Sequence, residues 1–217
     1  EGTGAWDEEG VVPLAIREIK EAAPELTVVA DVCLCEYTDH GHCGVVNRTT
    51  GRVDVDNDAT LRLLADQALI HAQAGADIVV MADHVTGNLV GPYHYKELLL
   101  PVHQEITAQI EGPLILHVCG DCTDRLDYFA ESGVDAYHME WQVDAKMAVA
   151  KVGDRMSLVG NVNNPQVLFQ GTPEDVHKQV RYAIEAGINI IGPECAIPLS
   201  TPMENLKAIV AAAHEGY

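Results

Sequence analysis

Short apolar runs rich in valine and isoleucine alternate with longer amphipathic stretches along this chain, and this alternation constrains the fold more than any other feature. The six runs are residues 26–35, 76–82, 113–119, 134–140, 156–162 and 188–195. Nearly continuous apolar character is typical of parallel strands covered on both faces. Strands that alternate with helices predict right-handed βαβ units. We therefore expect an α/β fold with six parallel strands. It is either an open doubly wound sheet or a TIM-barrel-like arrangement, an incomplete or rearranged (β/α)8 barrel.

Helix-capping residues mark several of the segments between these runs. Thr172 precedes a proline and two acidic residues, which predicts a helix start, and Gly187 is placed to end that helix. The pattern from Thr201 to Glu204 predicts a capping box, and Asn57 or Asp58 is expected to open another helix. The Gly-rich, polar segment 40–55 is predicted to be a long loop.

The charge balance argues against two classes of partner. The 217 residues carry 33 Asp and Glu against 13 Lys and Arg, a formal net charge of −20. Nucleic acid and anionic membranes both need a basic face, so neither is expected as a partner. No apolar run approaches the ~18 residues of a membrane helix, and no signal peptide is evident. We expect a soluble, cytoplasmic protein whose six cysteines are reduced thiols, available for metal binding or chemistry.

A first cluster of metal-ligating residue types follows the first apolar run. Cys33 and Cys35 lie on one face of a strand, together with Asp31, and Cys43 returns eight residues later beside two histidines. Three thiolates that converge on one point suit Zn²⁺ and leave a fourth position for water or substrate. The alternative is that these cysteines are small buried hydrophobic residues.

A second cluster is spread over three strand ends. His117 and Cys119 share one face at the end of the third run, Cys195 ends the sixth, and Glu140 ends the fourth. Carboxyl ends of parallel strands meet at one edge, so these residues predict a second zinc site with Glu140 as fourth ligand. Core cysteines are the alternative. Cys119 and Cys122 also form a C-x-x-C pair at a strand-to-helix junction, for which redox chemistry is a further reading.

Two polar residues at strand ends are candidates for catalytic roles. Asp83 follows the second run and could orient a substrate or a proton, and Asn161 belongs to the end of the fifth run. Helix caps and turn residues are the alternatives. The sequence contains no phosphate-binding G-x-x-x-x-G-K-[ST] or G-x-G-x-x-G motif, no G-x-S-x-G, and no lysine at a strand end, which argues against nucleotide, serine-hydrolase and Schiff-base chemistry.

Residues 1 to about 80 resemble porphobilinogen synthase (5-aminolevulinate dehydratase). The stretches that carry the resemblance are 4–7 (GAWD), 31–43 (DVCLCEYTDHGHC) and 55–60 (VDNDAT). The resemblance implies that Cys33, Cys35 and Cys43 match zinc ligands of that family and that Asp31 matches an active-site acid. It also implies that the strands carrying the family's Schiff-base lysines are missing, so dehydratase activity is not expected.

Residues from about 76 to 217 resemble instead the uroporphyrinogen decarboxylase superfamily, in particular its zinc-dependent methyltransferases. The matching stretches are 117–120 (HVCG), 160–165 (GNVNNP), 192–198 (GPECAIP) and 201–207 (TPMENLK). This resemblance implies zinc ligation by His117, Cys119 and Cys195, with Glu140 as fourth ligand. It also implies methyl transfer to a small thiol substrate. The chain lacks a D-x-H-x-x-G cobalamin-ligand motif, so the donor would be a separate methylated corrinoid protein.

The two resemblances meet in the run 76–82 and indicate a chimera of two (β/α)8 families. We expect a single barrel-like domain over 1–217, in which residues 1–80 are porphobilinogen-synthase-like and residues 81–217 are methyltransferase-like. By the strand order of these families it lacks the first two strands, and the open barrel edges would permit pairing into a homo-oligomer. Three hypotheses follow: a zinc-dependent corrinoid:thiol methyltransferase, a porphobilinogen synthase-related zinc protein, and an inactive zinc-binding scaffold.

Overall fold

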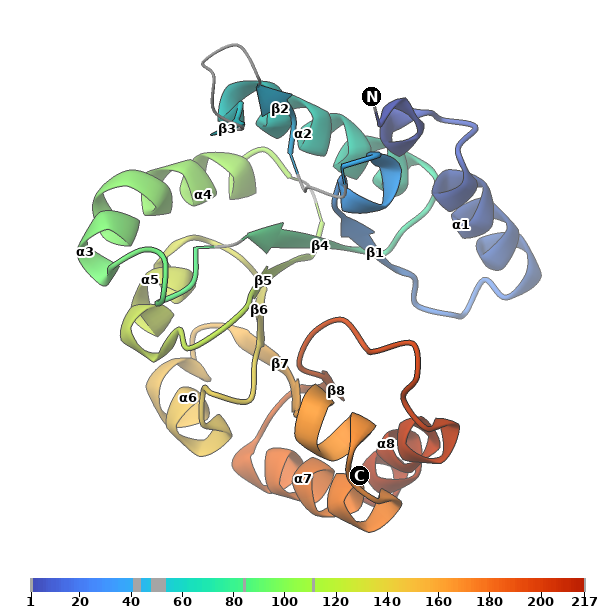
Figure 1. Ribbon diagram of the computed structural model, residues 1–217, viewed down its shortest axis with the longest axis vertical. Helices are drawn as coiled ribbons and strands as arrows, with labels where there is room; N and C mark the ends of the chain where they lie inside the picture. The colour runs from blue at the N-terminus through green and yellow to red at the C-terminus, as the bar shows by residue number, and fades with distance from the viewer. Residues whose placement is uncertain (1, 41–43, 48–53, 84, 111, 217) are drawn as a thin grey trace. The chain divides into compact units, whose positions relative to one another are not determined.

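The computed structural model describes residues 2–40, 44–47, 54–83, 85–110 and 112–216. The chain divides into two compact units, residues 1–82 and 83–217 (Figure 1). All six predicted strands are present, and each is parallel to the neighbour it pairs with inside its unit. The α/β class with TIM-barrel-like (β/α) units is therefore confirmed, with two strands fewer than a complete eight-stranded barrel.

The first unit is built on a pair of parallel strands. Its elements are η1 (Thr3–Trp6), α1 (Val11–Ala22), β1 (Val29–Val32), η2 (Cys35–Tyr37), β2 (Val46–Asn47), β3 (Asp54–Val55), α2 (Asn57–Gln73) and β4 (Ile78–Asp83). Strand β1 pairs with β4, with Val29 opposite Ile78. The outward residues of β1 alternate with buried ones, and the buried Ala30 packs with Ile16 of α1 and Ala74 at the end of α2.

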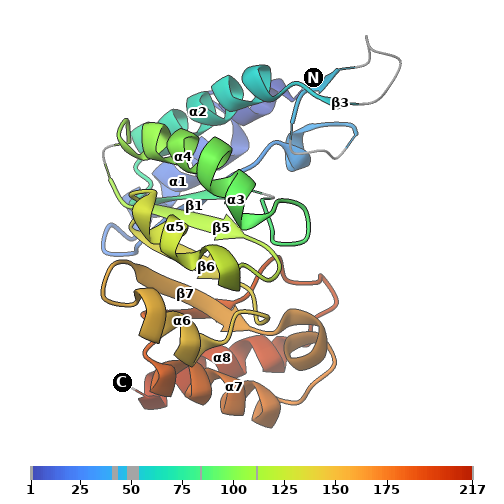
Figure 2. The same ribbon diagram turned by 90° about the vertical axis from the view of Figure 1, so that its left-hand side faces the viewer.

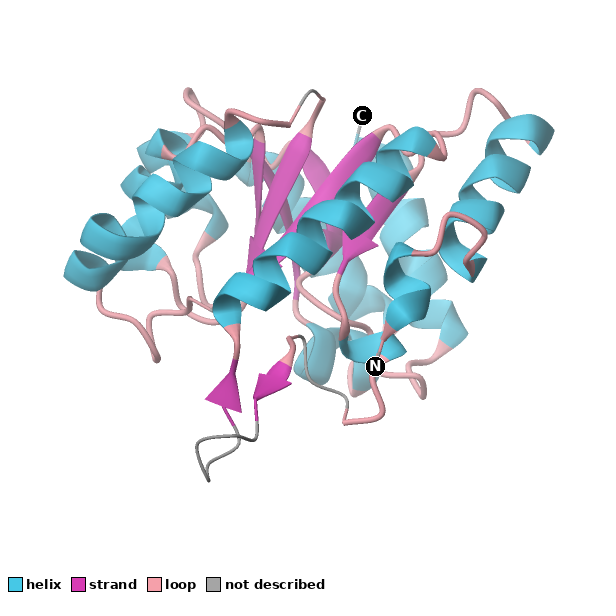
Figure 3. Ribbon diagram, turned by 90° about the horizontal axis from the view of Figure 1, so that it is seen from above, coloured by secondary structure: helices cyan, strands magenta, loops and turns pink. Residues whose placement is uncertain are grey.

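Two details of the first unit differ from the expectations. The segment predicted to be a loop contains the antiparallel hairpin β2–β3, which directly precedes α2 (Figure 3). Each hairpin strand has two residues, too short to leave a period-two pattern in the sequence. Helix α2 begins at Asn57, but its N-cap is Asp56, whose side chain accepts a hydrogen bond from the Ala59 N–H at 3.0 Å.

The second unit contains a four-stranded parallel sheet in the order β5-β6-β7-β8, which is also the chain order. Its elements are α3 (Pro92–His94), η3 (Tyr95–Leu99), α4 (Leu100–Thr107), β5 (Leu114–Val118), η4 (Thr123–Arg125), α5 (Leu126–Glu131), β6 (Ala136–Met139), α6 (Ala145–Val152), β7 (Ser157–Val162), η5 (Asn164–Phe169), α7 (Pro173–Ala186), β8 (Ile190–Pro193) and α8 (Met203–Gly216). Helices α5 and α6 cover the face of β5, β6 and β7 that is turned to the viewer in Figure 2.

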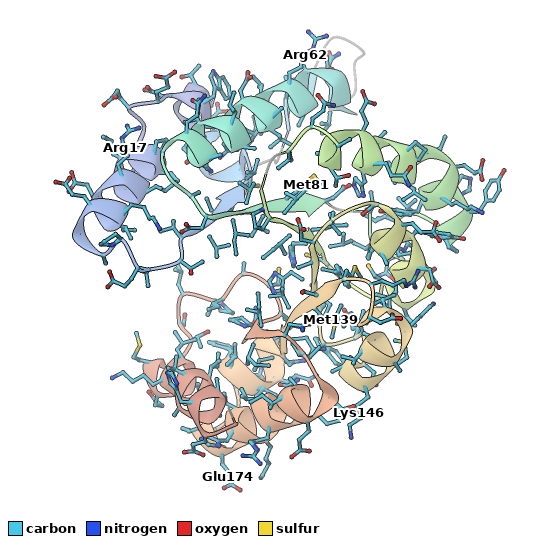
Figure 4. All side chains as sticks on the ribbon, turned by 180° about the vertical axis from the view of Figure 1, so that it is seen from behind. Arg17, Arg62, Met81, Met139, Lys146 and Glu174 are labelled. Atoms are coloured by element: carbon cyan, nitrogen blue, oxygen red, sulfur yellow. The ribbon has the colours of Figure 1, made fainter. Side chains whose placement is uncertain are left out.

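Apolar burial holds the strands and helices of this unit together. Met139 is fully buried among the strands, whereas Lys146 and Glu174 project from the outer helices (Figure 4). Helices α7 and α8 lie side by side and share a core cluster with β7 and η5 (Figure 1). Burial of such side chains contributes about 1.5–3 kcal/mol each, so the cluster fixes the helices against the strands that carry the site.

Of the two helix starts predicted in the second unit, one is confirmed and the other is wrong. Thr172 and Asp175 form the predicted start of α7 as a reciprocal capping box, and Gly187 ends the helix with a φ of 96°. The capping box expected from Thr201 to Glu204 is wrong, although α8 begins at Met203. The Thr201 hydroxyl is buried without a hydrogen-bond partner among the described residues.

No helix in the described parts of the chain is long and apolar enough to cross a membrane.

Candidate metal centre

Three side chains from two distant parts of the second unit converge at the carboxyl ends of its strands. His117 lies in β5, Cys119 follows that strand directly, and Cys195 lies two residues beyond β8. The Cys119 Sγ is 3.3 Å from the His117 Nε2 and 3.6 Å from the Cys195 Sγ. The three atoms lie within 4.8 Å of one another, and all three residues are half-buried. The structure thus brings together three of the residues that the sequence predicted as ligands.

A neighbouring histidine fixes the orientation of His117. The two rings lie with centroids 4.5 Å apart, and the His117 Nδ1 donates to the His138 carbonyl at 3.2 Å. Because a carbonyl can only accept, Nδ1 carries a proton, and Nε2 is the ring nitrogen that faces the two cysteines. His138 in turn donates from its Nε2 to the Pro193 carbonyl at 2.8 Å, and burial lowers the pKa of His138. This chain of contacts ties β5, β6 and β8 together at the site.

The two thiols differ in proton affinity because they share one hydrogen bond. Donation from Cys119 and then from His117 lowers the pKa of Cys195 to about 4. The same bond raises the pKa of Cys119, with burial and the nearby Glu140 carboxylate adding to the effect. Burial lowers the pKa of His117, but the hydrogen bond with Cys195, the charge there, the His138 carbonyl and the Glu140 charge together raise it above its usual value. One thiolate beside an imidazole is a donor set that attracts a cation.

The two distances from the Cys119 Sγ to the other donor atoms are compatible with tetrahedral zinc. Bonds of about 2.3 Å to sulfur and about 2.0 Å to nitrogen separate tetrahedral ligands by roughly 3.5–3.8 Å. The distances of 3.3 and 3.6 Å lie close to this range. Glu140 is outside the group of three, although its carboxylate is near enough to the Cys119 thiol to affect that group's pKa. The chemistry of the set, one imidazole and two thiols with a carboxylate close by, is that of a three-ligand site with one open position.

Two buried side chains, His103 and Tyr95, hold the Asp83 carboxylate through a chain of hydrogen bonds. The His103 Nε2 of α4 lies 2.8 Å from the Asp83 Oδ2, and the His103 Nδ1 lies 2.7 Å from the Tyr95 hydroxyl. Burial raises the pKa of Tyr95, so the hydroxyl stays protonated. It donates a hydrogen bond to the His103 Nδ1. The Nε2–H is then the donor to the carboxylate. The His103 side chain is 3% exposed and that of Asp83 is 32% exposed, so only the last member reaches solvent.

The loop after β4 packs against the turn that carries Cys119. Arg125 is fully buried and donates from Nη1 to the Val85 carbonyl at 2.7 Å and from Nη2 to the Val90 carbonyl at 2.5 Å. Gly120 has a φ of 80°, and a Cβ there would lie 3.3 Å from the Thr86 Cβ. Arg125 therefore fixes both ends of the loop that follows Asp83 against the next loop along the sheet.

Asn161 is 5% exposed and uses its amide to support the loop after β6. Its Nδ2 donates to the Val143 carbonyl at 2.9 Å and to the Glu140 carbonyl at 3.4 Å. The preceding Gly160 has a φ of 117°, and a Cβ there would lie 2.7 Å from the Met139 carbonyl oxygen. The close approach of β6 and β7 at this point requires glycine.

The first predicted cluster lies in the other unit. The Sγ atoms of Cys33 and Cys35 are 3.1 Å apart, so the structure brings this pair together, whereas Cys43 lies outside the described residues. Cys122, the second cysteine of the C-x-x-C pair, is fully buried and points its thiol at the Cys119 carbonyl at 3.7 Å.

Two family models match the chain, and they match different regions of it. The model of uroporphyrinogen decarboxylase (URO-D) matches residues 57–216, and the model of delta-aminolevulinic acid dehydratase matches residues 1–91. The first match spans most of the chain and contains His117, Cys119 and Cys195, the three residues that could hold a metal ion.

The chain belongs to the uroporphyrinogen decarboxylase family.

The known proteins that this chain resembles also fall into two groups, methyltransferases and dehydratases. The methylated-thiol–coenzyme M methyltransferase of Methanosarcina mazei is 29% identical over 96% of this chain and 60% of its own length. The delta-aminolevulinic acid dehydratase of Bacillus subtilis is 51% identical over 40% of this chain and 25% of its own length. A solved methyltransferase from Methanosarcina mazei superposes with a TM-score of 0.76 at 26% identity, covering 94% of this chain and 64% of that one. The chain spans about three fifths, or less, of the curated relatives it matches.

These comparisons confirm both resemblances and the chimera-like pattern. The two family matches overlap over residues 57–91, and the boundary between the compact units falls after Ala82, at the end of the predicted run 76–82. A dehydratase-like beginning and a decarboxylase-like remainder thus share one sequence.

Sequence reasoning missed several residues that shape the site. His138 lies two residues before Glu140 on the same strand face, so its period-two spacing was a usable signal. Glu194 precedes Cys195 directly but gave no signal of its own. His103 and Tyr95 lie within helical segments, where nothing in their spacing points to Asp83.

Proposed function

We propose that this chain carries the metal centre of a zinc-dependent methyltransferase, in which His117, Cys119 and Cys195 bind Zn²⁺. The centre would serve transfer of a methyl group from a methylated corrinoid protein to a small thiol. The observation that carries the proposal is the three-donor group, with its atoms within 4.8 Å, in a family member similar to coenzyme M methyltransferases.

Each residue of the centre has a separate role in this proposal. A zinc ion in the site would lower the pKa of a thiol ligand and make it a nucleophile near neutral pH. Glu140, close to the Cys119 thiol, would occupy the fourth position until the substrate thiol enters. Asn161 would act through Glu140, because its amide donates to the carbonyl of that residue and to that of Val143.

The proposed transfer balances without an added oxidant or reductant. The substrate thiol gives up its proton, and a sulfur electron pair forms the new carbon–sulfur bond. The methyl–cobalt bond of the donor breaks, and its electron pair stays with the cobalt. Asp83 would orient the substrate or take up the proton, with His103 and Tyr95 holding its carboxylate from behind.

The test is thiol-dependent demethylation of methylcobalamin, followed by its visible absorbance. We expect the Cys195→Ser variant to lose more than about 100-fold in rate, since second-sphere changes at metal sites alone cost 10–100-fold. Cys122→Ala is the matched control, because Cys122 lies three residues from Cys119 but outside the metal-ligating group. Equal rates for the wild type and Cys195→Ser would refute the proposal.

A second candidate function is zinc binding by Cys33, Cys35 and Cys43 in the first unit. It is favoured by the 3.1 Å separation of two of these thiols and by the 51% identity to a dehydratase over this region. We expect Cys33→Ser to lower the zinc content of the purified protein, and an unchanged content would refute it. Colour formation from 5-aminolevulinate in an Ehrlich assay would extend the candidate to dehydratase chemistry. An inactive scaffold would show turnover in neither assay.

A further inference from the structure

A buried carboxylate next to the metal-ligating group has no role in the chemistry proposed above. Glu194 lies between the last residue of β8 and Cys195, and it is 3% exposed. Its Oε2 accepts the Trp141 N–H at 2.8 Å and its Oε1 accepts the Asn164 N–H at 2.7 Å. Trp141 lies in the loop after β6, and Asn164 is the first residue of η5, which follows β7. One side chain therefore ties together the carboxyl ends of three neighbouring strands.

The Asn164 side chain in turn contacts the main chain at Cys195, one of the three candidate metal ligands. Its Nδ2 donates to the Cys195 carbonyl at 2.9 Å and to the Ala196 carbonyl at 2.8 Å, and the residue is 4% exposed. The side chain of Glu194 thus binds the main chain of Asn164, and the side chain of Asn164 binds the main chain that follows Glu194. This reciprocal pair encloses the backbone of Cys195.

Both oxygens of Glu194 have main-chain donors at short distances, which favours a positioning role over metal ligation. Trp141 directly follows Glu140, so the same carboxylate fixes the backbone beside the residue expected as fourth ligand. A buried charge is costly unless its partners are in place, and main-chain N–H groups are donors that every substitution except proline retains. Such a carboxylate helps to set the separation of the two segments whose N–H groups it accepts.

We propose that Glu194, with Asn164, is the positioning residue of the metal centre and sets Cys195 and Glu140 in register with His117 and Cys119. The inference rests on the proposed function, because the group that it positions is the expected zinc site. One carboxylate, which need not touch the metal, would then set the geometry of a site built from the ends of three strands.

The test compares metal binding by Glu194→Gln with that of the parent protein. Glutamine keeps the shape of the side chain, but its NH₂ group faces one of the two N–H donors and loses that hydrogen bond. Cys33→Ser and Cys35→Ser are included in all variants, so that the first cluster does not contribute. The measurements are zinc affinity by chelator competition and the absorption spectrum with Co²⁺, whose sulfur-to-cobalt bands report the ligand geometry.

We expect a 10–100-fold weaker zinc affinity and a changed Co²⁺ spectrum for Glu194→Gln. The matched control is Asp135→Asn, because the Asp135 Oδ2 also accepts a main-chain N–H, from Leu114 at 2.8 Å, but at the opposite end of β5. It should leave affinity and spectrum unchanged. If Glu194→Gln fails to fold, Asn164→Ala removes the contacts to Cys195 and Ala196 and should weaken zinc binding in the same direction.

The outcomes separate the two proposals. A parent protein that binds neither zinc nor Co²⁺ refutes the proposed function, and this inference with it. A parent that binds both, with a folded Glu194→Gln of equal affinity and spectrum, refutes the positioning role alone.

Discussion

Replacing Gly87 by alanine tests the contact between the loop that follows β4 and the turn that carries Cys119. A Cβ at residue 87 would lie 2.3 Å from the Asp121 carbonyl oxygen and 3.5 Å from the Arg125 Nη2. Ordinary contacts of this kind are at least about 3.4 Å, so one of the two loops must move by roughly 1 Å. The obstacle is backbone, which cannot turn aside as a flexible side chain can.

The cost follows from what the movement breaks. Arg125 is fully buried and donates to the carbonyls of Val85 and Val90, on either side of Gly87. Overpacking costs about 1–3 kcal/mol, and a buried polar group that loses its partner costs about 1–3 kcal/mol. We therefore expect the Gly87→Ala variant to lose about 2–6 kcal/mol of unfolding free energy.

Urea denaturation followed by circular dichroism measures this loss as a lower midpoint at unchanged slope. Gly192→Ala is the matched control, because a Cβ at Gly192 meets nothing within 4 Å. It should stay within about 0.5 kcal/mol of the wild type. Equal midpoints for Gly87→Ala and Gly192→Ala would show that the two loops are not in the tight contact described.

The remaining predictions concern stability. Thr172→Ala should cost about 1 kcal/mol of unfolding free energy in urea denaturation, because the capping box of α7 is lost. Thr201→Val should be neutral or stabilising, because it removes a buried hydroxyl without a partner among the described residues. The opposite order of stabilities would contradict the two assignments. Tyr95→Phe should lower the unfolding free energy by about 1 kcal/mol, since the His103 Nδ1 loses its donor, and an unchanged midpoint would argue against this chain of hydrogen bonds. Hydrogen bonds from the Val28 N–H and then from Lys20 lower the pKa of Asp77 in the folded protein. The contribution of Asp77 to stability is therefore fully present above the pKa of the unfolded carboxyl, and it is lost as the pH falls through the lower pKa of the folded state. The difference in urea midpoint between the wild type and Asp77→Asn should accordingly shrink with acidification, and a constant difference would exclude this linkage.

The strands and the principal site could be predicted because both depend on simple patterns. Runs of valine and isoleucine indicated all six strands. The rule that parallel strands end at one edge predicted that Cys195 lies near His117, 78 positions earlier in the sequence. Neither step needed knowledge of side-chain packing.

The supporting interactions could not be predicted because their partners are main-chain groups or lie on unrelated helices. Glu194 accepts from the N–H groups of Trp141 and Asn164, and every non-proline residue carries such a donor. His103 reaches Asp83 only because α4 packs behind that residue. The capping box expected at Thr201 was wrong because α8 begins at Met203, one residue later than a Thr201 N-cap requires.

The composite character of the sequence has a consequence for experiments on metal content. Cysteines that resemble zinc ligands occur in each of the two compact units, one set within the dehydratase match and the other within the decarboxylase match only. A zinc content measured on the whole protein therefore sums two independent candidates. Only variants that remove one set at a time assign the metal to residues.

Zinc content per chain, with the first cluster removed by Cys33→Ser and Cys35→Ser, is the most direct test of the proposed centre. In that background we expect about one zinc per chain after metal loading and desalting, and near zero when Cys195→Ser is added. Zinc that remains at about one per chain without Cys195 would contradict a centre built from His117, Cys119 and Cys195.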